Sequence, residues 1–408
     1  KTIFMTTMLL KNLIDNLNFK IGNEIVKGVS SDSRNVKKGD LFVSIKGNKF
    51  DGNKYIEEAL SKGAKAIIYS GSLKKKYSNT ILIKVDDTRS KLAEISSKFF
   101  KKKPKNIIAV TGTNGKTSIA DFFHQILMLN KKPVGLIGTL GFKKNNNLKK
   151  RELTTSDTIT LHRDLNEMKK SKIDNVILEA SSHGLKQRRL DFLNINSGIF
   201  TNLSHDHLDY HKNMKSYFNS KMYLFKKILH KKRSIICDKS IKEFPKIKAI
   251  ARRKKIYLID IKDVKEKLIN TKDLRFNEFQ LKNLSMAIIA AKLFKLSEKK
   301  IFKSLNKLND VNGRLELVRT FSNNIKVFVD FAHTPDALIK AINALKSIHG
   351  KNITLVFGCG GDRDFKKRPL MAKIASSNCK KIFVTNDNPR NESPFKIRNE
   401  IIKNIKNK

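Results

Sequence analysis

The chain has 408 residues, of which 39% are hydrophobic, so it can form two or three domains with separate cores. Its 85 Lys and Arg against 37 Asp and Glu give a formal net charge of +48, which would favour a nucleic-acid ligand if the cations were clustered. The lysines run instead from end to end, with no basic tail and no segment where aromatic residues and arginines alternate. We therefore predict no nucleic-acid partner and keep a nucleic-acid-binding NTPase as the alternative from another class.

The cysteines and the apolar runs indicate where the protein works. Cys237, Cys359 and Cys379 are too few and too scattered for a disulfide framework, which favours a reducing cytoplasm. No run approaches the roughly 18 apolar residues that span a membrane. The first residues also lack a signal-peptide cleavage site. We predict a cytoplasmic, monomeric protein without membrane insertion.

Residues 1–104 form the first predicted unit. The short β-rich runs DLFVSI (40–45) and AKAIIYS (64–70) are separated by glycine- and lysine-rich turns, which is typical of a small α/β domain. KKKP (101–104) then predicts a linker, because proline disfavours helix in the residue before it.

Residues 105–313 form the second predicted unit. It opens with the buried-type strand NIIAV (106–110), a glycine-bearing loop and an amphipathic helix over about 116–129. The later strands NVILEA (175–180) and NSGIFTN (196–202) alternate with helical segments. This alternation predicts a mainly parallel sheet.

The third predicted unit, residues 314–408, contains three strands that end in polar or glycine-rich loops: KVFVDFA (326–332), ITLVFGCGG (353–361) and KIFVTND (381–387). We expect these strands to be parallel, with helices between them. Ligands of such sheets bind outside the carboxyl ends of the strands, where these loops lie. The predicted fold class is therefore α/β in three domains.

A candidate phosphate site follows the strand at 106–110. The loop TGTNGKTS (111–118) offers backbone N–H groups at a helix N-terminus, the ammonium of Lys116 for terminal phosphates and the hydroxyl of Thr117 for Mg²⁺. It departs from the GxxxxGK[ST] pattern, since Val110 stands where the first glycine belongs. From these residues, kinase, ATPase and ligase all remain open.

Two further stretches carry candidate metal ligands. In LEASSHGL (178–185), Glu179 ends an apolar strand and is either a ligand that completes a magnesium site with Thr117 or a polar strand end before a helix cap. In TNLSHDHLDYH (201–211), His205 and His207 lie two residues apart and could chelate together. Zinc is the obvious ion for such a cluster. No cysteine lies nearby and phosphate chemistry is present, so we favour Mg²⁺.

Seven motifs now occur in order along the chain. They are VTGTNGKTS (110–118), LEASSHGL (178–185), FTNLSHDHLDYH (200–211), NGRLE (312–316), VDFAHTPDAL (329–338), FGCGGDRDFKKRPLM (357–371) and NDNPRNE (386–392). Together they resemble the Mur ligases, from SSDSR (30–34) to DNPR (387–390). The resemblance implies a UDP-substrate-binding domain at 1–104, a P-loop-type ATP-binding domain at 105–313 and a Rossmann-like amino-acid-binding domain at 314–408.

The resemblance also implies a reaction and its residues. ATP phosphorylates the D-glutamate carboxylate of UDP-N-acetylmuramoyl-L-alanyl-D-glutamate, and an incoming amino group then displaces phosphate to form an amide. The implied ATP-binding residues are Gly112, Thr113, Asn114, Gly115, Lys116, Thr117, Ser118, Asn283, Arg314 and Asp330. Two Mg²⁺ ions are implied, one held by Thr117 and Glu179 and the other by His207 and a carbamylated Lys221. The CO₂-derived carbamate turns the cationic lysine into an oxygen ligand. The implied catalytic residues are Lys116, Glu179, His207 and Lys221.

The substrate residues come from the same resemblance. The uridine end would meet Ser31, Ser33, Asn48, Lys49 and Phe50, and the muramoyl-peptide would meet Thr154, Thr155, Ser181, Gln187 and Arg189. The loop of Asp387, Asn388, Pro389 and Arg390 goes with meso-diaminopimelate, whose extra carboxylate Arg390, aided by Arg368, could pair with. A lysine-adding enzyme, a sibling Mur ligase and a folylpolyglutamate synthetase are the nearest alternatives. A family member continues through a GKGHE motif that is absent here, so we expect the third domain to be incomplete and full activity to need the remainder.

Overall fold

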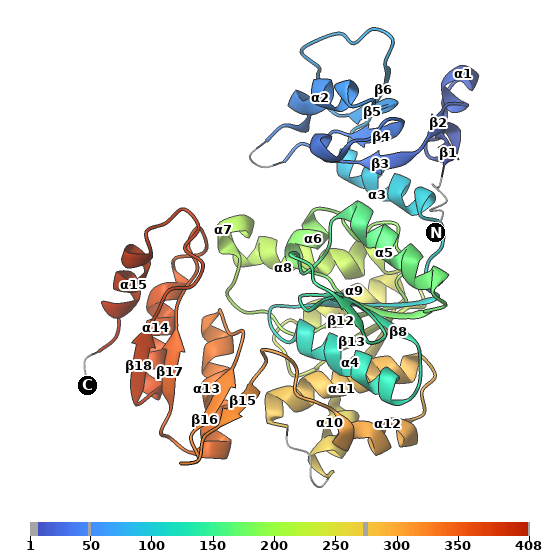
Figure 1. Cartoon of the computed structure of the whole chain (residues 1–408). Coiled ribbons are helices and arrows are strands. Elements are labelled where there is room, and N and C mark those ends of the chain that lie inside the picture. Colours follow the sequence, from blue (N-terminus) through green and yellow to red (C-terminus); the bar gives the residue numbers. More distant parts are fainter. Residues whose placement is uncertain (1–6, 48–49, 272–275, 407–408) are drawn as a thin grey trace.

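The computed structural model describes residues 7–47, 50–271 and 276–406, and their elements gather into three lobes (Figure 1). The first lobe (blue) lies above the middle lobe (green to yellow), and the third (orange to red) lies beside it. The α/β architecture predicted from the sequence is confirmed in all three.

The first domain is built on a four-stranded parallel sheet in the order β3-β4-β5-β6. Both strands expected here are present, because alternate apolar side chains of β4 and β5 pack into separate cores on the two faces of the sheet. Its elements are β1 (Met8–Leu9), η1 (Leu10–Asn12), α1 (Phe19–Gly22), β2 (Ile25–Val26), β3 (Gly28–Ser30), η2 (Ser33–Asn35), β4 (Asp40–Val43), η3 (Gly52–Tyr55), α2 (Ile56–Ser61), β5 (Ala66–Tyr69), β6 (Ile81–Lys84) and α3 (Thr88–Phe99).

The middle domain carries an eight-stranded sheet in the order β10-β9-β8-β11-β7-β12-β13-β14, parallel from β8 to β14 and ending in an antiparallel meander over β8, β9 and β10. Its strands are β7 (Asn106–Thr111), β8 (Val134–Gly138), β9 (Gly141–Lys144), β10 (Asn147–Lys149), β11 (Asn175–Glu179), β12 (Ser197–Phe200), β13 (Ser234–Cys237) and β14 (Tyr257–Asp260). The expected strands at 106–110, 175–180 and 196–202 are therefore confirmed as β7, β11 and β12.

Helices cover both faces of this sheet. Along β7, Ile108 and Val110 pack toward α4 and α11, while Ile107 and Ala109 pack into the opposite core with α5, α8 and α9, as the period of two requires. The helices are α4 (Lys116–Leu129), α5 (Thr158–Lys170), α6 (Ser182–Lys186), α7 (Leu208–His211), α8 (Met214–Tyr223), the π-helical turn η4 (Leu224–Ile228), α9 (Phe244–Lys254), α10 (Lys262–Ile269), α11 (Glu278–Leu293), α12 (Glu298–Ser304) and η5 (Leu305–Lys307). The predicted helix at 116–129 is confirmed as α4.

The third domain differs from the prediction in one respect. β17 and β18 are parallel as expected, but β16 pairs antiparallel with β15 in a separate two-stranded sheet. The hairpin forms because the two strands are joined by a short turn, which closes at low entropic cost when Phe321 N–H donates to Ile325 O at 2.8 Å. The elements are β15 (Glu316–Thr320), β16 (Lys326–Val329), α13 (Pro335–His349), β17 (Thr354–Phe357), α14 (Lys367–Asn378), β18 (Lys381–Val384) and α15 (Pro394–Ile402).

The three domains are held in place by polar contacts between them. Arg188 of the middle domain pairs with Asp87 of the first, Nε to Oδ2 2.7 Å. Asn114 of the loop after β7 donates to Asp336 at the start of α13, Nδ2 to Oδ2 2.8 Å. Residues at or after the ends of β8, β11, β7 and β12, which are neighbouring strands, line one cavity together with residues of the third domain.

Candidate active site

The phosphate loop after β7 owes its shape to glycine. Gly112 has φ +143°, and a Cβ there would lie 1.8 Å from Oγ1 of Thr201. Gly115, at the start of α4, has φ +88°, and its Cβ would lie 2.5 Å from Oδ1 of Asn283. Only glycine adopts these conformations without strain and allows such close approach. The loop is braced by Thr113 N–H, which donates to Asn202 O at 2.9 Å.

The Lys116 ammonium is folded back onto this loop. Its Nζ donates to the carbonyl oxygens of Gly112 and Thr113 at 3.0 and 2.7 Å. Burial lowers the pKa of Lys116, and the carboxylates of Glu179 and Asp206 oppose that shift. A phosphate anion would satisfy this cation better than two carbonyl dipoles do.

Thr117 and Glu179 lie together, as predicted. Oγ1 of Thr117 donates to Oε2 of Glu179 at 3.1 Å, and Glu179 also accepts from the backbone N–H of Thr139 at 2.8 Å. Arg314 reaches the same hydroxyl, Nη2 to Oγ1 3.1 Å. Burial raises the pKa of Glu179 and the charge of Lys116 counteracts it. A divalent cation would stabilise the ionised form of this buried carboxylate, and its oxygen atoms are the ligands that Mg²⁺ prefers.

His205, which could chelate a metal ion together with His207, has a different partner in the structure, whereas the rings of His207 and His211 both pack against His183, at centroid distances of 4.8 and 5.4 Å. His205 Nε2 lies 2.5 Å from Oδ2 of Asp364, and His207 Nε2 lies 3.2 Å from Oδ2 of Asp206. His211 Nε2 is hydrogen-bonded to the Ser182 hydroxyl at 3.0 Å. Within residues 7–47, 50–271 and 276–406, no group of three or more His, Cys, Asp or Glu is arranged around a metal position. The backbone of His207 is left-handed, with φ +53°, so His205 and His207 do not follow the period-two spacing of an extended strand.

Asp206 is the ionic centre between the middle and third domains. Its carboxylate contacts Lys367 Nζ at 2.9 Å and His333 Nε2 at 3.4 Å, both from the third domain. Burial alone would raise the pKa of Asp206, but the hydrogen bond from His333 and the charge of Lys367 hold it well below its usual value. Burial lowers the pKa of His207 to about 3, so its imidazole is neutral. A neutral imidazole is the form that binds metal ions.

Lys221 is buried in α8 beside the phosphate loop. Its Nζ donates to Gly112 O at 2.6 Å and lies 4.3 Å from the centroid of the Tyr217 ring. Burial, together with the charge of Lys116, lowers the pKa of Lys221 well below its usual value. This lowered pKa favours the unprotonated amine, which is the nucleophilic form.

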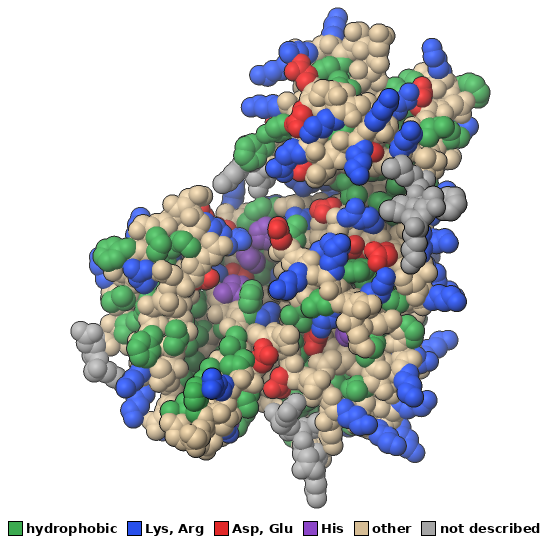
Figure 2. Space-filling view, viewed as in Figure 1, with side chains coloured by type: hydrophobic (Ala, Val, Ile, Leu, Met, Phe, Trp, Pro, Cys, Tyr) green, Lys and Arg blue, Asp and Glu red, His purple; other side chains and the backbone are tan. Residues whose placement is uncertain are grey.

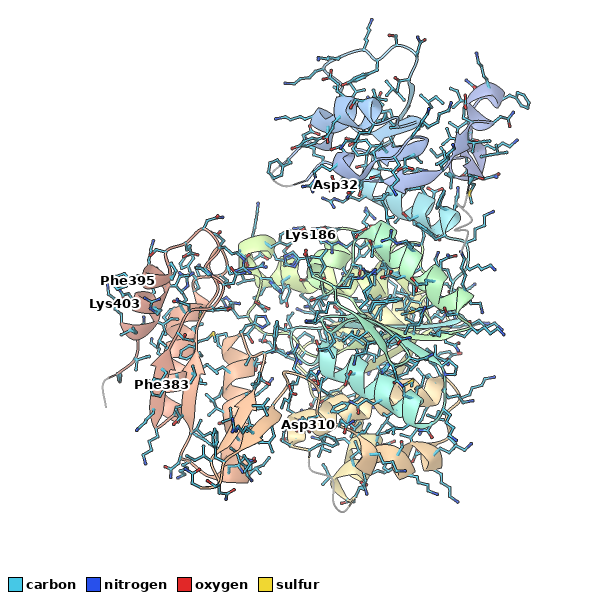
Figure 3. All side chains as sticks on the ribbon, in the orientation of Figure 1. Asp32, Lys186, Asp310, Phe383, Phe395 and Lys403 are labelled. Carbon is cyan, nitrogen blue, oxygen red and sulfur yellow. The ribbon has the colours of Figure 1, made fainter. Side chains whose placement is uncertain are left out.

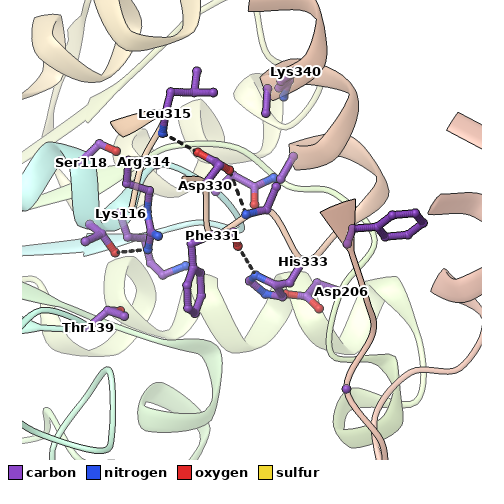
Figure 4. A pocket seen from close by; sticks show the side chains of 18 of the residues that line it. Lys116, Ser118, Thr139, Asp206, Arg314, Leu315, Asp330, Phe331, His333 and Lys340 are labelled. Atoms are coloured by element: carbon purple, nitrogen blue, oxygen red, sulfur yellow. Dashed lines mark hydrogen bonds and ion pairs between the residues drawn. The ribbon is translucent and has the colours of Figure 1, made fainter. Parts of the chain in front are cut away.

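Of the three remaining residues predicted for the nucleotide, Arg314 and Asp330 line one end of the cleft (Figure 4), and Asn283 lies against Gly115 of the phosphate loop. Nδ2 of the buried Asn283 has no hydrogen-bond partner among the described residues. The guanidinium of Arg314 lies 4.5 Å from the centroid of the Phe331 ring. Asp330 accepts from the backbone N–H groups of Leu315 and Ala332, both at 2.8 Å, and burial raises its pKa.

The residues predicted for the muramoyl-peptide form a connected group. Thr155 Oγ1 donates to Glu179 O at 2.7 Å and accepts from Ser181 N–H at 2.9 Å. Arg189 donates to Thr155 O and to Gln187 Oε1, both by guanidinium nitrogens, at 2.5 and 2.7 Å. Thr154 meets the Thr139 hydroxyl at 3.1 Å, and it lines the cleft together with Ser181.

The first-domain residues lie farther from this group. Asp32, between Ser31 and Ser33, is at the side of the first domain that faces the middle domain (Figure 3). The Ser33 hydroxyl is already engaged, donating to Oε2 of Glu58 at 2.6 Å. Phe50 is 69% exposed, which leaves its ring free to stack on a ligand. Asn48 and Lys49 lie outside the described residues.

The structure separates the two arginines expected to act together on the amino acid. Arg390 and Asp387 line the cleft, whereas Arg368 is 1% exposed and bonded to Glu392 and Glu400. Arg363, which the sequence reasoning did not single out, lines the cleft instead and is exposed. The signal for it was its place in GGDRD, directly after a strand that ends in glycines.

These groups surround one cavity of about 730 Å³ between the middle and third domains. Figure 2 shows histidine and acidic side chains gathered in this hollow. The phosphate loop and Glu179 form one end, and Arg363, Asp387 and Arg390 belong to the third-domain wall. The architecture is thus that of a P-loop nucleotide-binding protein whose ligand site is shared between domains.

The comparison with protein families places this architecture. Residues 25–100 match the Mur ligase family catalytic domain, 110–310 the Mur ligase middle domain, and 313–407 the Mur ligase glutamate ligase domain. The chain belongs to the Mur ligase family, whose members are ligases that use ATP and Mg²⁺. Among the residues that the structure describes, no helix is long and apolar enough to cross a membrane.

Curated relatives extend the match over most of the chain. The UDP-N-acetylmuramoyl-L-alanyl-D-glutamate–2,6-diaminopimelate ligase of Rhizobium meliloti is 36% identical over 92% of this chain and 82% of its own length. The protein of the same name from Rickettsia bellii is 38% identical over 93% and 84%. A solved structure with that enzyme name has a TM-score of 0.70 at 27% identity, covering 98% of this chain and 86% of the other. The MurF ligase of Thermotoga maritima, solved with ADP, shares the fold at 18% identity, with a TM-score of 0.58 over 92% and 96%.

Proposed function

We propose that this chain is an ATP-dependent ligase that joins meso-diaminopimelate to the D-glutamate of UDP-N-acetylmuramoyl-L-alanyl-D-glutamate in peptidoglycan synthesis. The observation that carries the proposal is the cavity, which joins the phosphate loop of the middle domain to the arginine-bearing loops of the third. Its relatives at 36% and 38% identity carry the name of this reaction.

The chemistry requires an activated carboxylate, because a carboxylate is a poor electrophile. In the proposed reaction a carboxylate oxygen attacks the γ-phosphorus of ATP and ADP leaves, giving an acyl phosphate. The amino group of the second substrate then attacks the acyl carbon, loses a proton and expels phosphate to leave an amide. Catalysis therefore consists mainly of holding three substrates in line and stabilising phosphoryl charge.

The phosphate loop from Gly112 to Ser118 is proposed to hold the triphosphate. Lys116 would exchange its two carbonyl contacts for phosphate oxygens. Asn283 offers the amide with no partner, and Arg314 and Asp330 complete the nucleotide end. The group Thr154, Thr155, Ser181, Gln187 and Arg189 is proposed to hold the muramoyl-peptide, with Ser31, Ser33, Asn48, Lys49 and Phe50 at its uridine end.

Two magnesium sites are proposed on the same residues. The first is Thr117 with Glu179, whose oxygen atoms already lie 3.1 Å apart. The second is the neutral imidazole of His207 with a carbamylated Lys221. Bound Mg²⁺ supplies positive charge against the phosphoryl oxygens. The chain's own part is to keep Glu179 buried and His207 unprotonated.

The state of Lys221 supports its carbamylation. Carbamate forms when the lone pair of an unprotonated amine attacks CO₂ and the nitrogen loses a proton, so a lowered pKa is the property this step needs. Burial provides it at Lys221. The product is an anionic oxygen ligand in place of an amine.

The amino-acid end supports diaminopimelate over lysine. Arg363 and Arg390 both line the third-domain side of the cavity, so two guanidinium groups are available for carboxylates. Lysine lacks the second carboxylate and would leave one cation without its partner. Arg363, and not the buried Arg368, is therefore proposed to pair with the substrate beside Arg390. The lysine-adding enzyme and the sibling ligases remain the competing functions.

One chain supplies every proposed site residue, so we propose a monomer. The use of ATP as a substrate supports a cytoplasmic location. We propose no nucleic-acid partner. A salt-dependent DNA affinity together with ATP turnover independent of the muramoyl substrate would favour the NTPase instead.

The test is phosphate release by the protein expressed from its complete gene. ATP, Mg²⁺ and UDP-N-acetylmuramoyl-L-alanyl-D-glutamate are supplied with either meso-diaminopimelate or L-lysine. Release that requires diaminopimelate supports the proposal. Release with lysine keeps the ligase and overturns the specificity, and no release with either amino acid refutes the function.

A further inference from the structure

The loops after β17 and β18 are bonded into one unit. Gly361 N–H donates to Asn388 O at 2.9 Å, and Arg390 Nη1 donates to Gly361 O at 2.6 Å. Asn391 donates to Oδ2 of Asp362 through its backbone N–H and its side-chain amide, at 3.1 and 2.8 Å. The approach is so close that a Cβ on Gly361 would lie 1.9 Å from Pro389 O. Arg363 and Arg390 therefore belong to one hydrogen-bonded unit, the double loop, which consists of the loops after β17 and β18.

Arg368 underlies this double loop. It belongs to α14, is 1% exposed, and is the largest of the fully buried side chains among the described residues. Nη2 lies 2.9 and 3.0 Å from the two carboxylate oxygens of Glu392 and 3.3 Å from Gly360 O, while Nη1 lies 2.7 Å from Oε2 of Glu400. One guanidinium thus contacts the loop after β17, the loop after β18 and helix α15.

Glu392 links Arg368 to the backbone of the loop after β17. While it accepts from Arg368, its Oε1 also accepts from the backbone N–H of Asp362 at 2.5 Å. Asp362 precedes Arg363, and Glu392 lies two residues beyond Arg390, so this one carboxylate ties together the backbones that carry both cleft arginines. Asp362 and Arg390 have φ +49°, a conformation that a non-glycine residue keeps only when its surroundings hold it.

We propose that Arg368 is a positioning residue that sets the separation of Arg363 and Arg390, and thereby the selection of an amino acid with two carboxylates. Arg368 does not itself touch the substrate. This inference rests on the proposed function and deepens it by naming what fixes the geometry of the amino-acid site.

Arginine is needed here for its shape as well as its charge. A guanidinium presents its donors in a rigid fork, so Nη1 and Nη2 can bond Glu400 and Glu392 at once. An ammonium is a point charge on a flexible chain and holds one of the two carboxylates at a fixed distance. Arg368→Lys therefore keeps the buried charge but loosens the double loop.

The expected signature is a change in amino-acid selection with the ATP site intact. In Arg368→Lys and in Glu392→Gln, we expect KM for diaminopimelate to rise about tenfold or more, as the loss of a charge-assisted hydrogen bond would give. The ratio of kcat/KM between diaminopimelate and lysine falls with it, because lysine uses only part of the arginine pair. KM for ATP and for the muramoyl substrate stays unchanged.

The experiment measures phosphate release for the wild type, the two variants and a matched control, using the protein expressed from its complete gene. Lys373→Met is the control, since Lys373 is exposed on the same helix α14. Thermal melting checks the fold, and if Arg368→Lys fails to fold, Glu392→Gln decides. The Glu392 side chain is 25% exposed, so Glu392→Gln changes a partly exposed group and leaves the Arg368 guanidinium in the interior.

The outcomes separate this inference from the function on which it rests. A wild type that releases no phosphate with either amino acid refutes the function. A wild type that selects diaminopimelate, with variants that keep its KM and selection ratio, overturns the positioning role. Variants that lose kcat with every substrate while the selection ratio stays fixed overturn it as well, because that pattern is a loss of structure and not of spacing.

Discussion

The conformation of the phosphate loop gives a prediction that can be worked from distances. Gly115→Ala places a Cβ 2.5 Å from Oδ1 of Asn283, in a backbone with φ +88°. The left-handed conformation costs a non-glycine residue about 1–2 kcal/mol. The clash with a buried amide adds about 1–3 kcal/mol of overpacking. If the loop of the variant relaxes away from this shape when empty, nucleotide binding must restore the shape. The two costs together are then at least about 2 kcal/mol, which weakens nucleotide binding at least about thirtyfold, since 1.4 kcal/mol is tenfold.

Gly71→Ala is the matched control. Gly71 also has a left-handed backbone, with φ +75°, but a Cβ there meets nothing within 4 Å. We expect it to cost the same backbone term in stability and to leave nucleotide binding unchanged. The assay is calorimetric titration with a non-hydrolysable ATP analogue and Mg²⁺.

A second background separates the two parts of the Gly115 effect. In Asn283→Ala the amide that would clash is gone, so adding Gly115→Ala should weaken binding only by the backbone part, about tenfold. Equal losses in both backgrounds would contradict the steric argument. Unchanged affinity in Gly115→Ala would refute the role of the loop conformation altogether.

Three further predictions concern ionisable side chains. Lys221→Ala should lower phosphate release about a hundredfold, and a small added carboxylate should restore part of it; full activity of the variant would contradict the ligand role. Burial lowers the pKa of Lys103 to about 8, so its protonation opposes folding below that pH, and this cost disappears as pH rises toward its unfolded value of 10.5. Lys103→Met should therefore raise stability by at most about 3 kcal/mol at pH 7 and by nothing near pH 10.5, which denaturation at both pH values checks; a gain independent of pH would be inconsistent with this cause. Asp364→Asn should loosen the third domain by weakening its hydrogen bond with His205, seen as a larger radius in X-ray scattering; an unchanged radius would show that the other contacts suffice.

The sequence was sufficient where the signal is local. The strand, loop and helix around Gly115 and Lys116 were all predicted, because apolar periodicity and glycine placement act within a few residues. The pairing of Thr117 with Glu179 was also anticipated, since carboxyl ends of neighbouring parallel strands meet at one edge of a sheet.

The sequence was insufficient where partners come from distant segments. The sequence could not show that His205 has Asp364 as its partner, because a different domain supplies that residue. Arg368 was predicted to bind substrate, but its guanidinium is hydrogen-bonded to Glu392 and Glu400. β16 likewise pairs antiparallel with β15 and not in the expected parallel sheet, because the apolar content of a strand does not show which strand it will pair with.

The uneven division of the apolar core implies an order of unfolding. The middle domain buries both faces of its sheet under helices. The third domain leaves Val356 63% and Phe383 57% exposed on its strands; Figure 3 labels Phe383. Regions with less buried apolar surface open at lower free energy. In hydrogen exchange the amides of α14 and β18 should therefore exchange before those of β7 and β11. Substrates that bridge the cleft would slow exchange most in the third domain, so heat resistance of the molecule would track occupancy of its active site.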